Sequence, residues 1–101
     1  MKEIEFRAAM VLECLGEPIR FQIVRYLHEG PKTVSELARL TKRHQTTVSQ
    51  HLATLRGLNL VRYRNRGQFA FYELKLKHCL QILNLAVECA REIASTPLKD
   101  K

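Results

Sequence analysis

Residues 33–57 read TVSELARLTKRHQTTVSQHLATLRG, a pattern that predicts two helices joined by a short turn. Thr33 is followed three residues later by Glu36, the spacing of a capping box, in which each side chain accepts a hydrogen bond from the other residue's backbone N–H at a helix start. A short helix is therefore predicted to begin here, and TKRH at residues 41–44 interrupts its apolar pattern. A second helix is predicted for residues 45–56.

The helix predicted for residues 45–56 has two different faces. Its apolar stripe, spaced to face a core, consists of Val48, Leu52 and Leu55. Its opposite side carries short side chains, namely Thr46, Thr47, Ser49, Gln50, Ala53 and Thr54. The major groove of duplex DNA admits a helix whose exposed face is small or polar, and a glutamine such as Gln50 can pair with adenine there. Gly57 and Asn59 are predicted to end the helix, since both tolerate a left-handed cap.

Two strand-like runs follow that helix. They read LVRYR at residues 60–64 and FAFYEL at residues 69–74, and NRGQ at residues 65–68 separates them. The sequence therefore predicts a β-hairpin with Arg64 and Arg66 at its tip. Arginines at such a tip would reach the minor groove, or the phosphates, beside a helix docked in the major groove.

Helices are also predicted on both sides of this unit. Residues 3–15 and 18–29 place apolar side chains at helical spacing, and Pro18 suits a first helical turn. Residues 76–95 carry two adjacent apolar stripes, Leu76, Leu80, Leu83, Val87, Ala90 and Ala94 beside Cys79, Ile82, Ala86, Cys89 and Ile93. One stripe docks a helix on its own domain, so the second indicates a further surface to cover. A homodimer through residues 1–15 and 76–95 is the economical solution for so small a chain.

The net charge of +7 is concentrated in residues 31–68. This stretch carries eight Lys and Arg residues against one acid, Glu36, whereas the two flanks together carry nine residues of each sign. A cationic face on a small domain favours a phosphate backbone as its partner. A solvated charge run is the ordinary alternative, but charges that only solvate a chain need not cluster in this way.

Length and composition narrow the class of protein. A chain of 101 residues predicts one domain, spanning residues 1–101. No apolar run approaches the roughly 18 residues that a membrane span needs, and acids among the apolar positions of residues 1–18 are unlike a secretory signal. Three cysteines, an odd number, favour reduced thiols over disulfides. We therefore expect a cytoplasmic protein without a membrane partner.

The order helix, helix, short capped helix, turn, helix, basic hairpin, helix is that of a winged helix-turn-helix: mainly α with a small β-hairpin. From Thr33 to Leu74, about two-fifths of the chain, the sequence resembles the arsenic-repressor-like (ArsR/SmtB) family of transcriptional repressors. The motifs that carry the resemblance are SELA at 35–38, VSQHL at 48–52, LR at 55–56, NLVR at 59–62, GQ at 67–68 and Tyr72. The resemblance implies a winged-helix dimer held by its first and last helices.

The family resemblance and the patterns of charge and helix periodicity each predict residues that contact DNA. The resemblance places its DNA-facing positions on Gln45, Thr46, Ser49, Gln50 and His51. The charge and helix patterns add Thr47 and five phosphate or groove contacts, Lys42, Arg43, Arg56, Arg64 and Arg66. For His51 two interpretations stay open: a phosphate contact, or a ring that packs or caps at the helix edge.

The chain departs from the family pattern in two places. Lys42, Arg43 and His44 stand in the turn where the family usually has glycine, apolar residues and a serine cap, so the geometry of this turn is open. The third helix lacks the cysteine motif that many metal-sensing relatives carry there, which excludes an arsenic or cadmium site of that type.

Two kinds of sensing chemistry stay open, besides a sensor that uses neither thiol nor metal and a chain that senses nothing. Relatives with a zinc site on the last helix resemble this chain at Leu76, His78, Cys89 and Glu92, paired across the two-fold axis, but leucine cannot bind zinc. A thiol sensor would instead use Cys14 with Cys79 or Cys89, and could take As(III) or form a reversible disulfide or polysulfide link. Core packing of the three cysteines is the alternative, since free cysteine is often buried.

These observations lead to one functional hypothesis. The chain is expected to be a homodimeric repressor that binds an inverted repeat and is released by an inducer, either a thiol-reactive species or a metal or metalloid such as Zn or As(III). Because no phosphate-binding loop, nucleophile motif or carboxylate pair is present, an enzyme is not expected. The alternative is a winged helix that binds protein or RNA without sensing an inducer.

Overall fold

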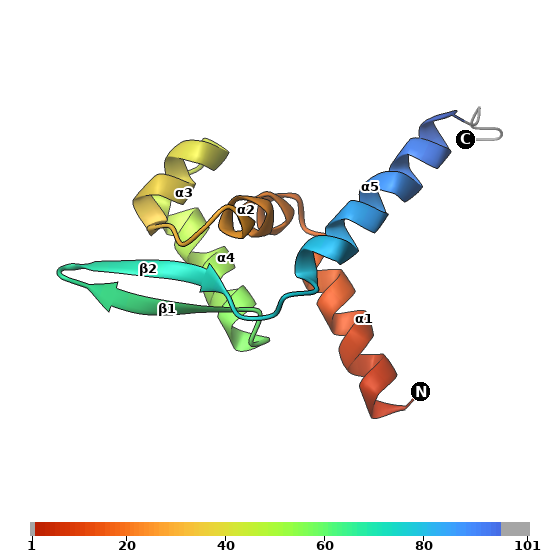
Figure 1. Ribbon diagram of the computed structural model, residues 1–101, viewed down its shortest axis with the longest axis horizontal. Coiled ribbons are helices and arrows are strands. Elements are labelled where there is room, and N and C mark those ends of the chain that lie inside the picture. Colours follow the sequence, from red (N-terminus) through yellow and green to blue (C-terminus); the bar gives the residue numbers. More distant parts are fainter. Residues whose placement is uncertain (1, 96–101) are drawn as a thin grey trace.

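The structure, a computed structural model, describes residues 2–95 of the chain. Its elements follow in the order α1 (Glu3–Leu15), α2 (Pro18–His28), α3 (Val34–Thr41), α4 (Gln45–Gly57), β1 (Val61–Arg66), β2 (Phe69–Leu74) and α5 (Cys79–Ser95). The predicted order of elements is confirmed. In Figure 1 the β-hairpin extends to one side of the molecule and the free ends of α1 and α5 to the other, with α2 between them.

The helix starts are made by the side chains that the sequence indicates. At α3 the capping box is present: the Glu36 backbone N–H donates to Thr33 Oγ1 at 3.1 Å, and the Thr33 N–H donates to Glu36 Oε1 at 2.9 Å. At α2, Pro18 occupies the first helical position, where its missing N–H costs nothing, and Glu17 accepts from the Arg20 backbone N–H. These two caps fix where α2 and α3 begin.

The core forms where the helices and the base of the hairpin meet. The apolar stripe predicted for α4 is fully buried, because Val48, Leu52 and Leu55 pack against α2 and α3. The other buried side chains are Cys14, Leu15, Ile23, Val24, Leu27, Leu37, Ala38, Leu60, Val61, Cys79 and Leu83. Burying the inner face of α4 leaves its short polar side chains on the outside of the domain.

Two predicted boundaries were wrong. The last helix begins at Cys79, not at residue 76, so Leu76 and His78 lie in the preceding loop. The first strand runs further than predicted, because β1 continues to Arg66 and pairs antiparallel with β2 in the register Arg66 to Phe69, whereas β2 has the predicted bounds. The turn is therefore the two residues 67–68, with Gly67 at a φ of 62°, which glycine adopts without strain. A bridge between Lys32 and Tyr72 adds to the sheet.

Large parts of α1 and α5 are not packed against their own domain. Ile4 and Phe6 on α1 are 72% and 57% exposed, and Leu85 and Ile93 on α5 are 66% and 59% exposed. Only the first turn or two of α5 and the end of α1 enter the core. Within residues 2–95, no helix combines the length and apolar character that crossing a bilayer requires.

Candidate nucleic-acid interface

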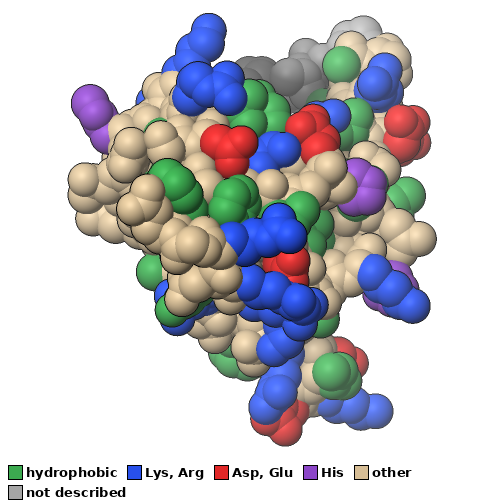
Figure 2. All heavy atoms as spheres, turned by 60° about the vertical axis from the view of Figure 1, so that its left-hand side comes forward, with side chains coloured by type: hydrophobic (Ala, Val, Ile, Leu, Met, Phe, Trp, Pro, Cys, Tyr) green, Lys and Arg blue, Asp and Glu red, His purple; other side chains and the backbone are tan. Residues whose placement is uncertain are grey.

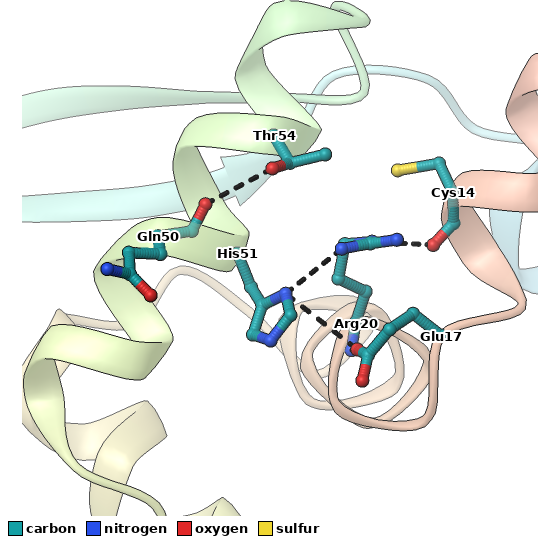
Figure 3. A network of polar contacts seen from close by, with 6 residues as sticks. All are labelled: Cys14, Glu17, Arg20, Gln50, His51 and Thr54. Atoms are coloured by element: carbon teal, nitrogen blue, oxygen red, sulfur yellow. Dashed lines mark hydrogen bonds and ion pairs between the residues drawn. The ribbon is translucent and has the colours of Figure 1, made fainter.

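The outer face of α4 is exposed, as its pattern predicts. Thr46, Ser49 and Gln50 are exposed and Thr47 is half-buried. The Thr54 hydroxyl donates to the Gln50 backbone carbonyl at 3.3 Å, whereas the Gln50 side-chain amide points away from α2 into open space (Figure 3). Gln45 at the start of α4 is also exposed. The helix therefore offers short donors and acceptors with no bulky side chain in the way.

The unusual turn before α4 is formed by a left-handed residue. Lys42 has a φ of 58° and ends α3, and its N–H contacts the Arg39 carbonyl at 3.3 Å. The Arg43 N–H then reaches back to the Ala38 carbonyl at 3.0 Å, which satisfies the open end of the helix. Lys42 thus takes the conformation that glycine adopts most readily, and it places two exposed cationic side chains beside the start of α4.

His51 lies differently from its neighbours on α4. Its side chain is only 19% exposed, and Arg20 Nη1 on α2 lies 3.0 Å from its Nδ1. Glu17 Oε2 lies 3.7 Å from the same nitrogen. Of the two interpretations of His51, these contacts are those of a ring that packs at the helix edge. Sequence reasoning missed Arg20 and Glu17, because nothing in their spacing shows that they meet a residue more than 30 positions away.

The β-hairpin of residues 60–74, called the wing below, contains one glutamate, Glu73, beside its arginines. Glu73 on β2 accepts from Arg62 Nε at 2.6 Å, and Arg64 Nε lies 3.1 Å from the same carboxylate oxygen. The Arg62 hydrogen bond chiefly lowers the pKa of Glu73 from its ordinary value, and Arg64 adds to the effect. The placement of Arg64 at the hairpin tip was wrong: it lies within β1, opposite Phe71, because the strand extends to Arg66.

Two further arginines stack on aromatic rings of the wing. The Arg56 guanidinium carbon at the end of α4 lies 4.8 Å from the centre of the Tyr63 ring, and that of Arg66 lies 6.0 Å from the Phe71 ring. Tyr63 in turn contacts Tyr72 across the sheet, with ring centres 5.4 Å apart. Such stacking orients the guanidinium planes while leaving their donors open to a phosphate.

The cationic side chains gather on the face that carries the hairpin. In Figure 2, which brings the hairpin side forward, Lys and Arg side chains crowd together around enclosed carboxylates. Arg43 and Arg56 flank α4, and Arg66 stands next to the turn of the wing. Three of the arginines in the charged middle of the chain, Arg62, Arg64 and Arg66, thus lie on one strand of the hairpin.

The three cysteines differ in their surroundings. Cys14 and Cys79 are buried in the same core cluster, whereas Cys89 is exposed. Burial is the main cause that raises the pKa of both buried thiols, and Cys14 adds to the effect at Cys79. Core packing, the alternative to sensing, thus fits Cys14 and Cys79 within one chain and does not fit Cys89. Of the two pairs considered for a thiol sensor, the structure brings Cys14 and Cys79 together.

The predicted zinc residues do not meet within one chain. His78 precedes α5, while Cys89 and Glu92 follow along the helix. Ten residues of helix separate Cys79 from Cys89, about 15 Å along the axis at 1.5 Å per residue. Over the part of the chain that the structure describes, no three His, Cys, Asp or Glu side chains lie close enough together to hold a metal ion. A site using these residues would need a second copy of the chain.

Comparison with known proteins agrees with this geometry. Residues 17–63 match the family described as "Bacterial regulatory protein, arsR family". A homolog of the cadmium resistance transcriptional regulatory protein CadC from Staphylococcus aureus is 30% identical over 93% of this chain and 78% of its own. The regulator NmtR of Mycobacterium tuberculosis is 35% identical over 80% of this chain and 68% of its own.

Solved structures share the fold. HlyU from Vibrio cholerae superposes with a TM-score of 0.78 at 29% identity, over 88% of this chain and 97% of that one. The winged helix-turn-helix domain of Mb0332 from Mycobacterium bovis has a TM-score of 0.78 at 24% identity, over 97% of this chain and 91% of that one. The fold is therefore a winged helix-turn-helix, and the chain belongs to the arsR family of bacterial regulatory proteins.

Proposed function

We propose that this protein is a transcriptional repressor that binds an inverted-repeat operator as a homodimer. In this proposal residues 33–57 form the DNA-reading helix-turn-helix, with α4 in the major groove, and residues 60–74 form the wing. The observation that carries it is the outer face of α4, which is exposed, short and polar and is flanked by Arg43 and Arg56. Relatives named as repressors include SmtB of Mycobacterium tuberculosis, 34% identical over 92% of this chain.

The dimer is proposed through residues 1–15 and 76–95. Its support is the apolar surface that α1 and α5 leave exposed, which a single chain cannot bury. Between them lies an apolar groove of about 710 Å³, lined by Val11 and Leu12 of α1, Leu76, and Cys79 and Ile82 of α5. A second copy that covers both faces would place two α4 helices side by side, so the operator would repeat with two-fold symmetry.

Release from DNA is proposed to follow a thiol-reactive inducer or a metal ion. The thiol version is supported by Cys14 and Cys79, which share one buried cluster where α1 and α5 enter the core. The metal version would bring together His78, Cys89 and Glu92 from two copies, a set that suits Zn²⁺. Cadmium resistance in the name of the CadC homolog belongs to that relative, and here it supports testing soft metals.

The competing class is a winged helix that binds protein or RNA. Such a protein has no need for a row of short polar side chains on α4 or for arginines stacked on the wing. We infer that the chain is not an enzyme and acts in the cytoplasm, where its free thiols would stay reduced.

The test is fluorescence-anisotropy titration with the duplex upstream of its own gene and with a random duplex of equal length, over a range of salt. We expect tighter binding to the upstream duplex and a steep salt dependence. Gln50→Ala should reduce the preference between duplexes, whereas Arg56→Ala should weaken binding to both and flatten the salt slope by about one unit. Arg25→Ala, at an exposed position on α2, is the matched control. If Gln50→Ala and Arg56→Ala each weakened binding to both duplexes equally, α4 would not be the helix that reads the sequence.

Inducer release is tested in the same assay. Zn²⁺, As(III) or a polysulfide is added to the reduced, metal-free complex. Loss of binding with one additive identifies the chemistry, and Cys14→Ser or Cys89→Ser should then separate the thiol version from the metal version. Binding that no additive changes would count against both.

A further inference from the structure

The guanidinium of Arg20 lies between α1, one of the two helices proposed to form the dimer, and α4, the helix proposed to read DNA. Its Nε donates to the Cys14 backbone carbonyl at 2.7 Å, and its Nη1 donates to His51 Nδ1 at 3.0 Å. Figure 3 shows this side chain bridging from the end of α1 to the middle of α4. One side chain of α2 thus touches two other helices.

The contact with α1 has a clear physical basis. The last carbonyls of a helix have no partner within it, and the helix end carries partial negative charge. The Gly16 N–H satisfies the carbonyls of Leu12 and Glu13, which leaves that of Cys14 for the Arg20 guanidinium. A cation in this position stabilises the end of α1 and ties it to α2.

The contact with α4 is made through the ring of His51. A guanidinium has only donors, so in this 3.0 Å hydrogen bond Arg20 Nη1 donates and His51 Nδ1 accepts. Glu17 lies 3.7 Å from the same nitrogen and also accepts from the Arg20 backbone N–H at 2.9 Å, which holds the start of α2 in register. His51 adjoins Gln50 in sequence, so orienting this ring orients the turn of α4 that faces outward.

We propose that Arg20 is a positioning residue for DNA recognition, which couples the end of α1 to the reading turn of α4 through His51. The inference rests on the proposed function, because it takes α4 to be the helix that reads DNA. Arg20 itself is assigned no contact with DNA. A shift of α1 in the dimer would reach α4 through this side chain. Arg20 should therefore affect the discrimination between duplexes without affecting the number of phosphate contacts.

The test compares Arg20→Gln with wild type on the upstream and random duplexes over a range of salt. We expect about tenfold weaker binding to the upstream duplex, the scale of one lost charge-assisted hydrogen bond, with an unchanged salt slope. Binding to the random duplex should not change. Arg25→Gln is the matched control, since Arg25 lies on the same helix, is exposed and stacks on Phe21. Wild-type discrimination in Arg20→Gln, or a salt slope flatter by one unit, would overturn the proposal.

Variants at His51 test the coupling itself. His51→Asn places Oδ1 where Nδ1 was, so it should keep the bond and bind within about twofold of wild type. His51→Leu should match Arg20→Gln, and the double variant should be no weaker than the worse single one. Additive losses would show that the two residues act separately and overturn the proposal. Arg20→Lys, which keeps a cation at the end of α1 but lacks the fork, serves where Arg20→Gln does not fold.

Amide exchange without DNA separates this proposal from the proposed function. Faster exchange at residues 49–52 in Arg20→Gln, with α3 unchanged, supports the coupling even if the wild type does not prefer the upstream duplex. Unchanged exchange at these residues overturns it even if the wild type is a specific repressor. Lack of duplex preference in the wild type counts against the proposed function alone.

Discussion

At the scale of single residues, Lys42 combines two opposing properties. Its left-handed φ of 58° costs an ordinary residue about 1 kcal/mol, which glycine avoids. Its charge, in contrast, lies beside the start of α4. We expect Lys42→Gly to raise the free energy of unfolding by up to about 1 kcal/mol and to weaken DNA binding, measured by urea unfolding and anisotropy. Lys42→Asn should weaken DNA binding as much as Lys42→Gly does, with a smaller increase in the free energy of unfolding. Unchanged DNA affinity in both variants would show that Lys42 does not contact phosphates.

Glu73 sets the charge and the acid sensitivity of the wing. The pKa of Glu73 is lowered chiefly by the Arg62 hydrogen bond. Its ion pairs therefore stabilise the fold fully at a pH above 4.5, the ordinary pKa of the carboxyl group. This contribution is lost as the pH falls below 4.5 through the lowered pKa. The Tm of Glu73→Gln should therefore lie below that of wild type at pH 7 and converge with it at low pH, as followed by circular dichroism.

The same substitution frees two arginines for a phosphate backbone. Glu73→Gln should tighten binding to both specific and random duplexes at low salt, because Arg62 and Arg64 lose their shared partner. Weaker duplex binding in Glu73→Gln would mean that Glu73 orients the arginines instead of competing for them.

At the scale of an element, α3 depends on its capping box. It has only eight residues, too few to hold a helix by itself, so the two bonds between Thr33 and Glu36 and the burial of Leu37 support it. The hydrogen bond from the Thr33 N–H chiefly lowers the pKa of Glu36. Thr33→Ala should lower the free energy of unfolding by about 1 kcal/mol in urea, whereas Thr33→Ser should stay close to wild type. Equal losses in the two variants would contradict the role of the hydroxyl.

At the scale of the whole molecule, α1 and α5 govern assembly. Leu85 is 66% exposed in one chain, so a charge there should cost the isolated fold little and a dimer much. We expect Leu85→Glu to sediment as a monomer with near-native circular dichroism and to lose operator binding. Phe69→Glu, at an exposed site on the wing, should remain dimeric. A dimeric Leu85→Glu variant would move the interface away from α5.

Local patterns in the sequence were enough to predict the helix caps, the buried face of α4 and the order of the elements. The capping box, Pro18, the buried stripe of α4 and the left-handed Asn59 were all predicted and are all present, because each depends on residues within one or two turns of each other. The excess of Lys and Arg over residues 31–68 could likewise be read from the sequence, although a count of charges does not place them on one surface. Hydrophobic period and backbone chemistry act over that range, so the order of elements could be deduced.

Only the tertiary structure decided which distant groups meet. The pairing of Arg20 with His51 and of Arg62 and Arg64 with Glu73 joins residues on different elements, and packing selects Cys79 over Cys89 as the neighbour of Cys14 in the core. The start of α5 at Cys79 and the two-residue turn of the wing were also missed. Strand register and helix packing select these contacts, and both depend on the whole core being assembled at once, which no local pattern records.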